Sequence, residues 1–179
     1  MFDHVTDPLA RAHAEEVAVS LRAAGRFGAD ARLGVAYSGG VDSAVLLALA
    51  VRTLGRDAVV GILAVSESLA RRERTAAHRL AAEIGADIAE IATEEVANPD
   101  YAANPVTRCY FCKDEMFARI DDEAAGHLRL AAVAYGENAD DARRPDRPGA
   151  HAATEHGVLR PLAEAGLTKP TLYSYFPSK

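Results

Sequence analysis

Val35-Ala-Tyr-Ser-Gly-Gly-Val-Asp-Ser-Ala-Val45 is the stretch of this sequence that decides the fold. Residues 33–37 before its centre predict a short apolar strand, and residues 44–50 after it predict a helix. A strand that turns directly into a helix presents unpaired backbone N–H groups at the positive end of the helix dipole. The intervening segment, Ser38 to Ser43, therefore predicts an anion site, and its two glycines allow a phosphate to approach the backbone closely.

The polar side chains of this loop favour a phosphate that is bound together with a cation. Ser38 and Ser43 provide hydroxyl donors, whereas the carboxylate of Asp42 repels a phosphate unless a cation such as Mg²⁺ bridges the two. No Gly-Lys-Ser/Thr follows the glycines, which excludes a Walker A loop. A glycine-rich turn without a ligand is the alternative, and the full six-residue pattern argues against it.

Composition limits the class of protein. The chain has 179 residues, of which 49% are apolar, and this predicts one globular domain with a sizeable core. The net charge of −6 argues against a broad nucleic-acid-binding face. We find no membrane-spanning run and no signal-peptide layout at the N-terminus, so the cytoplasm is the expected compartment.

Apolar runs recur at the spacing of a parallel α/β sheet. Residues 58–65 form a continuous apolar run, which is typical of a strand buried on both faces. Further strands are expected at 87–91 and 128–135, and helices at 8–24, 69–84 (with Ser66 to Ser68 as its cap), 109–122 and 151–156. Ligands bind at the carboxyl ends of such strands. Ser66 and Glu67 are therefore expected on the same edge as the loop Ser38–Ser43, which we call the phosphate loop.

Both cysteines lie in one segment, Thr107-Arg-Cys-Tyr-Phe-Cys-Lys113. Two cysteines are too few for a disulfide framework. A zinc site needs two more ligands, for which His78, His127, His151 and His156 are candidates, and an iron–sulfur cluster needs at least one more cysteine. A redox dithiol is a further interpretation, since Arg108 and Lys113 would favour a thiolate. Two small, half-buried residues at a helix start are the plain alternative.

Two later segments add polar candidates. Gly136-Glu-Asn-Ala-Asp-Asp141 follows a predicted strand, which places Asn138 where it can contact a ribose or substrate, and Asp140 or Asp141 where it can assist a cation. An Asx-turn with helix-capping carboxylates is the alternative. Arg147 lies on a loop rich in Arg and Pro and suits bidentate recognition of a phosphate or carboxylate, although solvated basic loops are common.

Together and in this order, the motifs resemble the PP-loop ATP pyrophosphatase superfamily. Within it they resemble the ATP-dependent sacrificial sulfur transferases that help build the nickel-pincer nucleotide cofactor of lactate racemase. The resemblance covers about residues 32–169 and implies a Rossmann-like, adenine nucleotide alpha-hydrolase-like α/β fold with flanking helices. It rests on Ser38–Ser43, Arg108–Lys113, Gly136–Asp141, Arg147–Gly149, Glu155–Val158 and Pro161–Lys169.

The resemblance also implies an activity and a set of site residues. The enzymes adenylate a carboxylate of a pyridinium dicarboxylate mononucleotide, release pyrophosphate and then form a thiocarboxylate. In one branch the sulfur comes from a cysteine of the enzyme, and in another branch three cysteines hold a [4Fe–4S] cluster. Carried over, the implied cofactors are ATP and Mg²⁺. The implied residues are Ser38, Gly39, Gly40, Val41, Asp42, Ser43, Ser66 and Asn138 for ATP, Asp42 and Arg108 for catalysis, Asp42 for Mg²⁺, Arg147 and Asp141 for the substrate, and Cys109 and Cys112 for a cluster.

The resemblance ends near Lys169. Residues 1–165 are expected to form the PP-loop domain, whereas Thr168-Lys-Pro-Thr-Leu-Tyr-Ser-Tyr-Phe-Pro-Ser-Lys179 resembles the end of a TetR-type helix-turn-helix. The stretch Leu162–Lys169 fits either family, so we place a junction within it and treat residues 166–179 as an atypical tail. The family has a further cysteine and a C-terminal oligomerisation region after this point. The sequence thus predicts a C-terminally truncated domain that is incomplete for sulfur transfer and lacks the family's oligomer contacts.

Other functions remain open at this stage. An amidotransferase-type synthetase would leave the Cys-x-x-Cys segment unexplained, and a tRNA thiolase would need a basic face that the net charge opposes. An inactive nucleotide-binding remnant is a further alternative. A TetR-like DNA-binding regulator would need a three-helix unit before the tail, which we do not find. The expected partner is a nucleotide-type small molecule, not a nucleic acid or a membrane.

Overall fold

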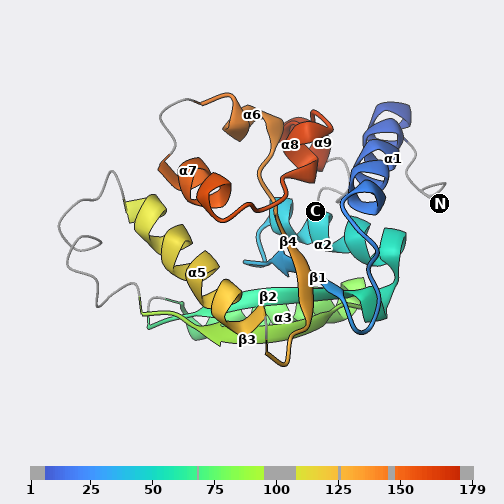
Figure 1. The fold of residues 1–179 in the computed structure, drawn as a ribbon. Helices are drawn as coiled ribbons and strands as arrows, with labels where there is room; N and C mark the ends of the chain where they lie inside the picture. The colour runs from blue at the N-terminus through green and yellow to red at the C-terminus, as the bar shows by residue number, and fades with distance from the viewer. Residues whose placement is uncertain (1–6, 68, 95–107, 125, 145–147, 174–179) are drawn as a thin grey trace.

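A parallel sheet forms the centre of the molecule (Figure 1). The computed structural model describes residues 7–67, 69–94, 108–124, 126–144 and 148–173, with side chains left out at 108, 109, 111, 124 and 148–151. The sheet has four strands in the order β3-β2-β1-β4. They are β1 (Arg32–Ala36), β2 (Val59–Val65), β3 (Asp87–Ala92) and β4 (Leu130–Tyr135), and every neighbouring pair is parallel. The predicted parallel α/β fold is confirmed.

The strand order reverses once. From β1 the chain crosses through α2 (Val41–Leu54) and η1 (Arg56–Ala58) to β2, and then through α3 (Arg71–Ile84) to β3. It returns through α5 (Arg108–Ala124) to β4, which pairs with the other side of β1. In such sheets the loops that leave two neighbouring strands in opposite directions open a crevice at the carboxyl ends, and this is where ligands bind. Here that position lies between β1 and β4.

Two apolar cores cover the two faces of the sheet. Because side chains alternate along a strand, Leu33 and Val35 of β1 enter the first core and Ala36 enters the second. The first core packs α1 (Pro8–Ala23), α2 and α3 against the sheet, and the second packs α5 and α7 (Pro148–Glu155). None of the described helices combines the length and the apolar character that crossing a bilayer requires.

Three further short helices follow β4: α6 (Ala139–Ala142), α8 (Pro161–Glu164) and α9 (Lys169–Tyr173), and Figure 1 shows α8 and α9 beside α1. The segment from α8 to α9 contributes to the first core. Leu162, Leu167 and Leu172 are fully buried there. Leu159 forms a parallel bridge with Ala134 and so extends the sheet beyond β4. Residues 166–173 therefore pack with the domain, and the origin of the tail at 166–179 stays a prediction.

Several helix starts differ from the prediction, among them that of α7, which begins at Pro148 instead of residue 151. The helix expected from Ala44 begins at Val41, because Gly40 has an extended backbone (φ −74°, ψ 161°) and serves as its N-cap. Asp42 and Ser43 therefore lie in a first helical turn. The predicted cap at Ser66 to Ser68 is wrong: Ala70 is the N-cap of α3, without a side-chain hydrogen bond. The Ser66 carbonyl instead accepts from the Leu69 N–H (3.1 Å), so a turn and an extended residue precede the helix.

A charged cluster attaches α3 to the edge strand β3. The Arg74 guanidinium donates two hydrogen bonds to the Glu90 carboxylate, and the His78 ring lies 2.7 Å from Glu90 Oε1. The hydrogen bond from Arg74, followed by that from His78, lowers the pKa of Glu90 to about 2. A carboxyl group with a lowered pKa stabilises the fold above its unfolded pKa, and this contribution is lost as the pH falls.

We therefore expect Glu90→Gln to lower the free energy of unfolding at pH 7, because the Arg74 guanidinium loses the carboxylate that it binds and the His78 ring loses the same partner. The difference from the wild type should shrink as the pH falls from about 4.5 to about 2. In this range the carboxyl group of the unfolded chain protonates first, and that of the native protein protonates only near pH 2. Urea unfolding at several pH values measures it. Glu83→Gln, which removes an exposed pair with Arg79 on the same helix, serves as the control and should have little effect. A difference that stays constant down to pH 2 would contradict the assignment.

Candidate functional site

The phosphate loop connects β1 to the first turn of α2. Among the described residues, nothing accepts a hydrogen bond from the backbone N–H groups of Val41, Asp42 and Ser43. These three donors lie at the positive end of the helix dipole, which is the geometry of an anion site. The structure thus places the predicted loop residues at the predicted kind of helix start.

The two serines of the loop hydrogen bond to each other and to the loop backbone. Ser43 Oγ donates to the Gly40 carbonyl (3.0 Å) and accepts from the Ser38 N–H (3.2 Å). The hydroxyls of Ser38 and Ser43 are 3.2 Å apart, and Ser38 Oγ accepts from the Gly40 N–H (3.3 Å). The predicted hydroxyl donors are therefore brought together, and in this state they fix the shape of the loop.

Asn138 joins the two loops across the crevice. Its side chain is fully buried, and Nδ2 donates to Asp42 Oδ2 (2.8 Å) and to Asp141 Oδ2 (3.0 Å). Its Oδ1 accepts from the Asp141 N–H (2.9 Å), which caps α6. Asn138 therefore caps α6, as the alternative interpretation predicted, and also lies beside the phosphate loop, as the first interpretation predicted. Asp42, Asn138 and Asp141 form a single polar cluster between the ends of β1 and β4.

Gly136 allows the two loops to approach this closely. A Cβ atom at this position would lie 3.0 Å from the Asp42 carbonyl carbon and 3.0 Å from the backbone nitrogen and Cα of Ser43. Those are backbone atoms of the first turn of α2, which cannot move aside as a flexible side chain can. The end of β4 thus packs directly on the helix start that carries the free N–H groups.

Three charged residues at this edge were not expected from the sequence. Glu137 is 1% exposed; its Oε2 lies 3.5 Å from Arg160 Nη1, and its Oε1 has no hydrogen-bond partner among the described residues. Lys169 Nζ lies 3.4 Å from Asp141 Oδ1, and its backbone N–H donates to Asp140 Oδ2 (2.9 Å). Glu137 directly precedes the candidate residue Asn138, and this position in the sequence could have indicated that it lies at the site. Arg160 and Lys169 come from a distant segment and had no pattern pointing to this cluster.

The carboxylates fit a divalent cation that is shared with a bound phosphate. Asp42 uses Oδ2 for Asn138, and within the described residues its Oδ1 has no hydrogen-bond partner. The described part of the chain holds no group of three or more metal-ligating side chains. Mg²⁺ is usually bound by one or two carboxylates plus substrate phosphates, so the arrangement fits a cation that arrives with a nucleotide.

The remaining predicted residues lie at the same edge or outside the described part. Ser66 follows β2, the neighbour of β1. Lys113 of α5 contacts the Tyr135 hydroxyl and lies 4.1 Å from the centre of its ring, so the start of α5 lies at the carboxyl end of β4. Cys112 is exposed on this helix. The side chains of Arg108 and Cys109, and all of Arg147, lie outside the described residues.

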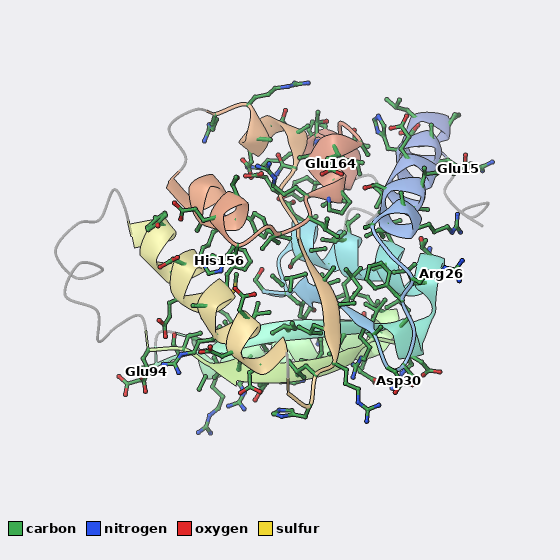
Figure 2. All side chains as sticks on the ribbon, in the orientation of Figure 1. Glu15, Arg26, Asp30, Glu94, His156 and Glu164 are labelled. Atoms are coloured by element: carbon green, nitrogen blue, oxygen red, sulfur yellow. The ribbon has the colours of Figure 1, made fainter. Side chains whose placement is uncertain are left out.

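Three of the four histidines considered as zinc donors lie against carboxylates. His156 lies between α5 and α7 (Figure 2), with Nδ1 2.7 Å from Asp121 Oδ2 and Nε2 3.1 Å from Asp114 Oδ1. Burial lowers the pKa of His156, but the hydrogen bonds and charges of Asp121 and Asp114 outweigh it and raise the pKa overall. His78 pairs with Glu90 and His127 with Glu123. The side chain of His151 is not described.

Comparison with known proteins gives a consistent set of relatives. A family model described as asparagine synthase matches residues 18–156. An uncharacterized protein of Synechocystis sp. is 44% identical over 143 residues, which are 80% of this chain and 52% of that protein. Pyridinium-3,5-bisthiocarboxylic acid mononucleotide synthase of Lactiplantibacillus plantarum is 34% identical over 138 residues, 77% of this chain and 49% of its own length.

The chain therefore spans about half the length of the curated relatives it matches. Among solved structures, NMN synthetase from Francisella tularensis aligns with a TM-score of 0.64 at 17% identity, over 93% of this chain and 67% of that one. At this identity the likeness shows a shared fold.

We expect Gly136→Ala to lower the free energy of unfolding by about 1–3 kcal/mol, because the new methyl group overpacks against immobile backbone. Urea unfolding measures the loss. Gly28→Ala is the matched control, since a Cβ atom there meets nothing within 4 Å. Its effect should stay within about 0.5 kcal/mol. Equal effects of the two substitutions would show that the close contact at Gly136 does not exist.

Asn138→Asp tests the buried amide. The substitution keeps the oxygen that caps α6. It replaces the Nδ2 donor to Asp42 and Asp141 by an oxygen of a third carboxylate group. We expect a loss of roughly 1–3 kcal/mol in the free energy of unfolding at pH 8, because the buried position loses its donor and gains a third carboxylate beside Asp42 and Asp141. The double variant Asp42→Asn with Asn138→Asp restores a donor–acceptor pair and should recover part of the loss. Wild-type stability of the single variant at pH 8 would refute this account.

Proposed function

The chain belongs to the asparagine synthase family and to the wider group of PP-loop, adenine nucleotide alpha-hydrolase-like enzymes that use ATP, and from this membership we propose a specific reaction. The proposed enzyme is an ATP-dependent sulfur transferase. It adenylates a carboxylate of a pyridinium dicarboxylate mononucleotide, with release of pyrophosphate, and a thiocarboxylate then replaces the adenylate. The 34% identical relative named as the bisthiocarboxylic acid mononucleotide synthase supports the choice of substrate.

One observation carries the proposal: the hydrogen bond from Asn138 to Asp42, beside the free N–H groups of α2, at the reversal of strand order. This hydrogen bond holds the Asp42 carboxylate beside the backbone N–H groups at residues 41–43, which are the proposed donors to phosphate. We assign the phosphates of ATP to the N–H groups of Val41, Asp42 and Ser43, with Gly39 and Gly40 allowing close approach. Asp42 Oδ1 would hold Mg²⁺, which neutralises charge on the phosphates of the bound nucleotide.

The residues on this edge suit adenylation because that step needs little covalent chemistry from the protein. A carboxylate oxygen of the substrate attacks the α-phosphorus of ATP, the bond from that phosphorus to the bridging oxygen breaks, and pyrophosphate leaves. Negative charge therefore accumulates on the leaving group. Preorganised N–H donors at the start of α2 stabilise this charge without having to reorient during the reaction.

The second half-reaction exchanges oxygen for sulfur. A sulfur nucleophile at the sulfide oxidation level attacks the acyl carbon of the adenylate, the bond from that carbon to the phosphate oxygen breaks, and AMP leaves. We keep Arg108 as the proposed catalytic arginine, and Arg147 and Asp141 as the proposed substrate-binding residues. Cys109 and Cys112 are one fewer than the three cysteines of the cluster-containing branch that this sequence resembles, so we derive no step through a cluster.

Calorimetry with Mg-ATP tests the nucleotide site. The wild type should bind, and Asp42→Ala should weaken binding by about tenfold or more, because the carboxylate that neutralises the shared cation is lost. Asp57→Ala in η1 is the control and should bind like the wild type. Removal of Mg²⁺ by a chelator should reduce the affinity of the wild type more than that of Asp42→Ala. Tight Mg-ATP binding by Asp42→Ala would rule out this position for the nucleotide.

Pyrophosphate release tests the reaction. We expect release that depends on the pyridinium dicarboxylate mononucleotide and that exceeds the release seen with nicotinic acid mononucleotide, which carries a single carboxylate. Asp42→Ala should lower the rate by at least about tenfold. Release that is equal with the two acceptors would favour a different PP-loop synthetase.

A further inference from the structure

Two residues at the phosphate loop, Tyr37 and Gly39, contact Ala77 of α3. Tyr37, the residue after β1, is 2% exposed, and its hydroxyl donates to the Ala77 carbonyl (2.9 Å) in a buried position. Burial raises the pKa of Tyr37 to about 12, so the phenol keeps its proton and remains a donor. The start of the loop is thus bonded to the backbone of α3, forty residues along the chain.

Gly39 contacts the same residue. Its φ of +75° is in the left-handed region that favours glycine, and a Cβ atom there would lie 3.0 Å from Ala77 Cβ and 3.2 Å from Ala77 Cα. The loop backbone therefore lies directly on the Ala77 methyl group. Ala77 is itself 3% exposed, so neither partner can move away without repacking the first core.

The outer side of α3 is held independently. Arg74 and His78 lie one turn apart on α3, before and after Ala77 in the sequence, and both bind Glu90 of β3. These contacts connect α3 to the sheet on the side away from the loop.

We infer that Ala77, together with Tyr37, is a positioning residue. It fixes the position of the phosphate loop relative to α3 and thereby the affinity of the loop for the pyrophosphate part of ATP. The inference rests on the proposed ATP site and extends it to a residue that touches no nucleotide. A larger side chain at position 77 lifts Gly39 and turns the nearby N–H donors away from the phosphates, whereas a lost Tyr37 hydroxyl frees the start of the loop.

This role predicts a nucleotide-dependent effect, which a loss of general stability does not produce. ATP carries the β- and γ-phosphates that a displaced loop would release, and AMP lacks them. We expect Ala77→Val to raise the Kd for Mg-ATP by about tenfold or more, which is about 1.4 kcal/mol, while the Kd for AMP changes less than about twofold. Tyr37→Phe should shift the same ratio by about threefold.

Ala81→Val is the matched control. Ala77 and Ala81 are the two buried residues of α3, one turn apart, and both belong to the first core. Valine at either position overpacks that core and should lower the melting temperature similarly. Only Ala77→Val should change the ratio of the two dissociation constants. Should Ala77→Val fail to fold, Tyr37→Phe measures the same ratio with one hydroxyl group removed.

The outcomes separate the two proposals. Failure of the folded wild type to bind Mg-ATP more tightly than AMP overturns the proposed function itself. Selective binding by the wild type, with the same ratio of dissociation constants in Ala77→Val, Tyr37→Phe and Ala81→Val, overturns the positioning role and leaves the proposed function in place. A changed ratio in Ala77→Val and Tyr37→Phe, but not in Ala81→Val, supports the inference.

Discussion

The contact between the end of β4 and the first turn of α2 is the constraint on which the candidate site depends. Gly136 brings two backbones together at a distance that excludes any side chain, and Asn138 then reaches Asp42. The buried amide uses Nδ2 for two carboxylates and Oδ1 for the helix cap, so it is satisfied on both sides. A buried polar group of this kind stabilises one arrangement only, because any other leaves charges without partners. The phosphate loop is therefore held in a defined position relative to the second loop.

Local patterns in the sequence predict those parts of the structure that depend only on residues close together along the chain. The continuous apolar run at 58–65 predicts a buried strand, and Ser38 to Ser43 predict an anion site between a strand and a helix. The sequence also predicts that Asn138 and Asp42 share one edge, because parallel strands end on the same side. Their hydrogen bond could not be predicted, since it depends on the order in which the strands pair.

The missed features come from long-range packing. Ala77 is one alanine among many, and nothing in its local sequence marks it as the support of Gly39. Arg160 and Lys169 reach the cluster only because residues 158–173 fold back over β4 and α2. The tail was assigned to another source on the basis of its pattern. Its described part nevertheless places Leu167 and Leu172 in the main core, where apolar residues of suitable size pack whatever their origin.

The reversal of strand order also bears on how the protein folds. Asp42 and Asn138 are 96 residues apart in the sequence, whereas Tyr37 and Ala77 are 40 apart. Closing a longer loop costs more chain entropy, and a chain made from its N-terminus produces the nearer pair first. The phosphate loop therefore gains its support on α3 while β4 is still missing. The crevice between β1 and β4 is completed only when the last strand docks, so the candidate site forms only once the whole sheet has assembled.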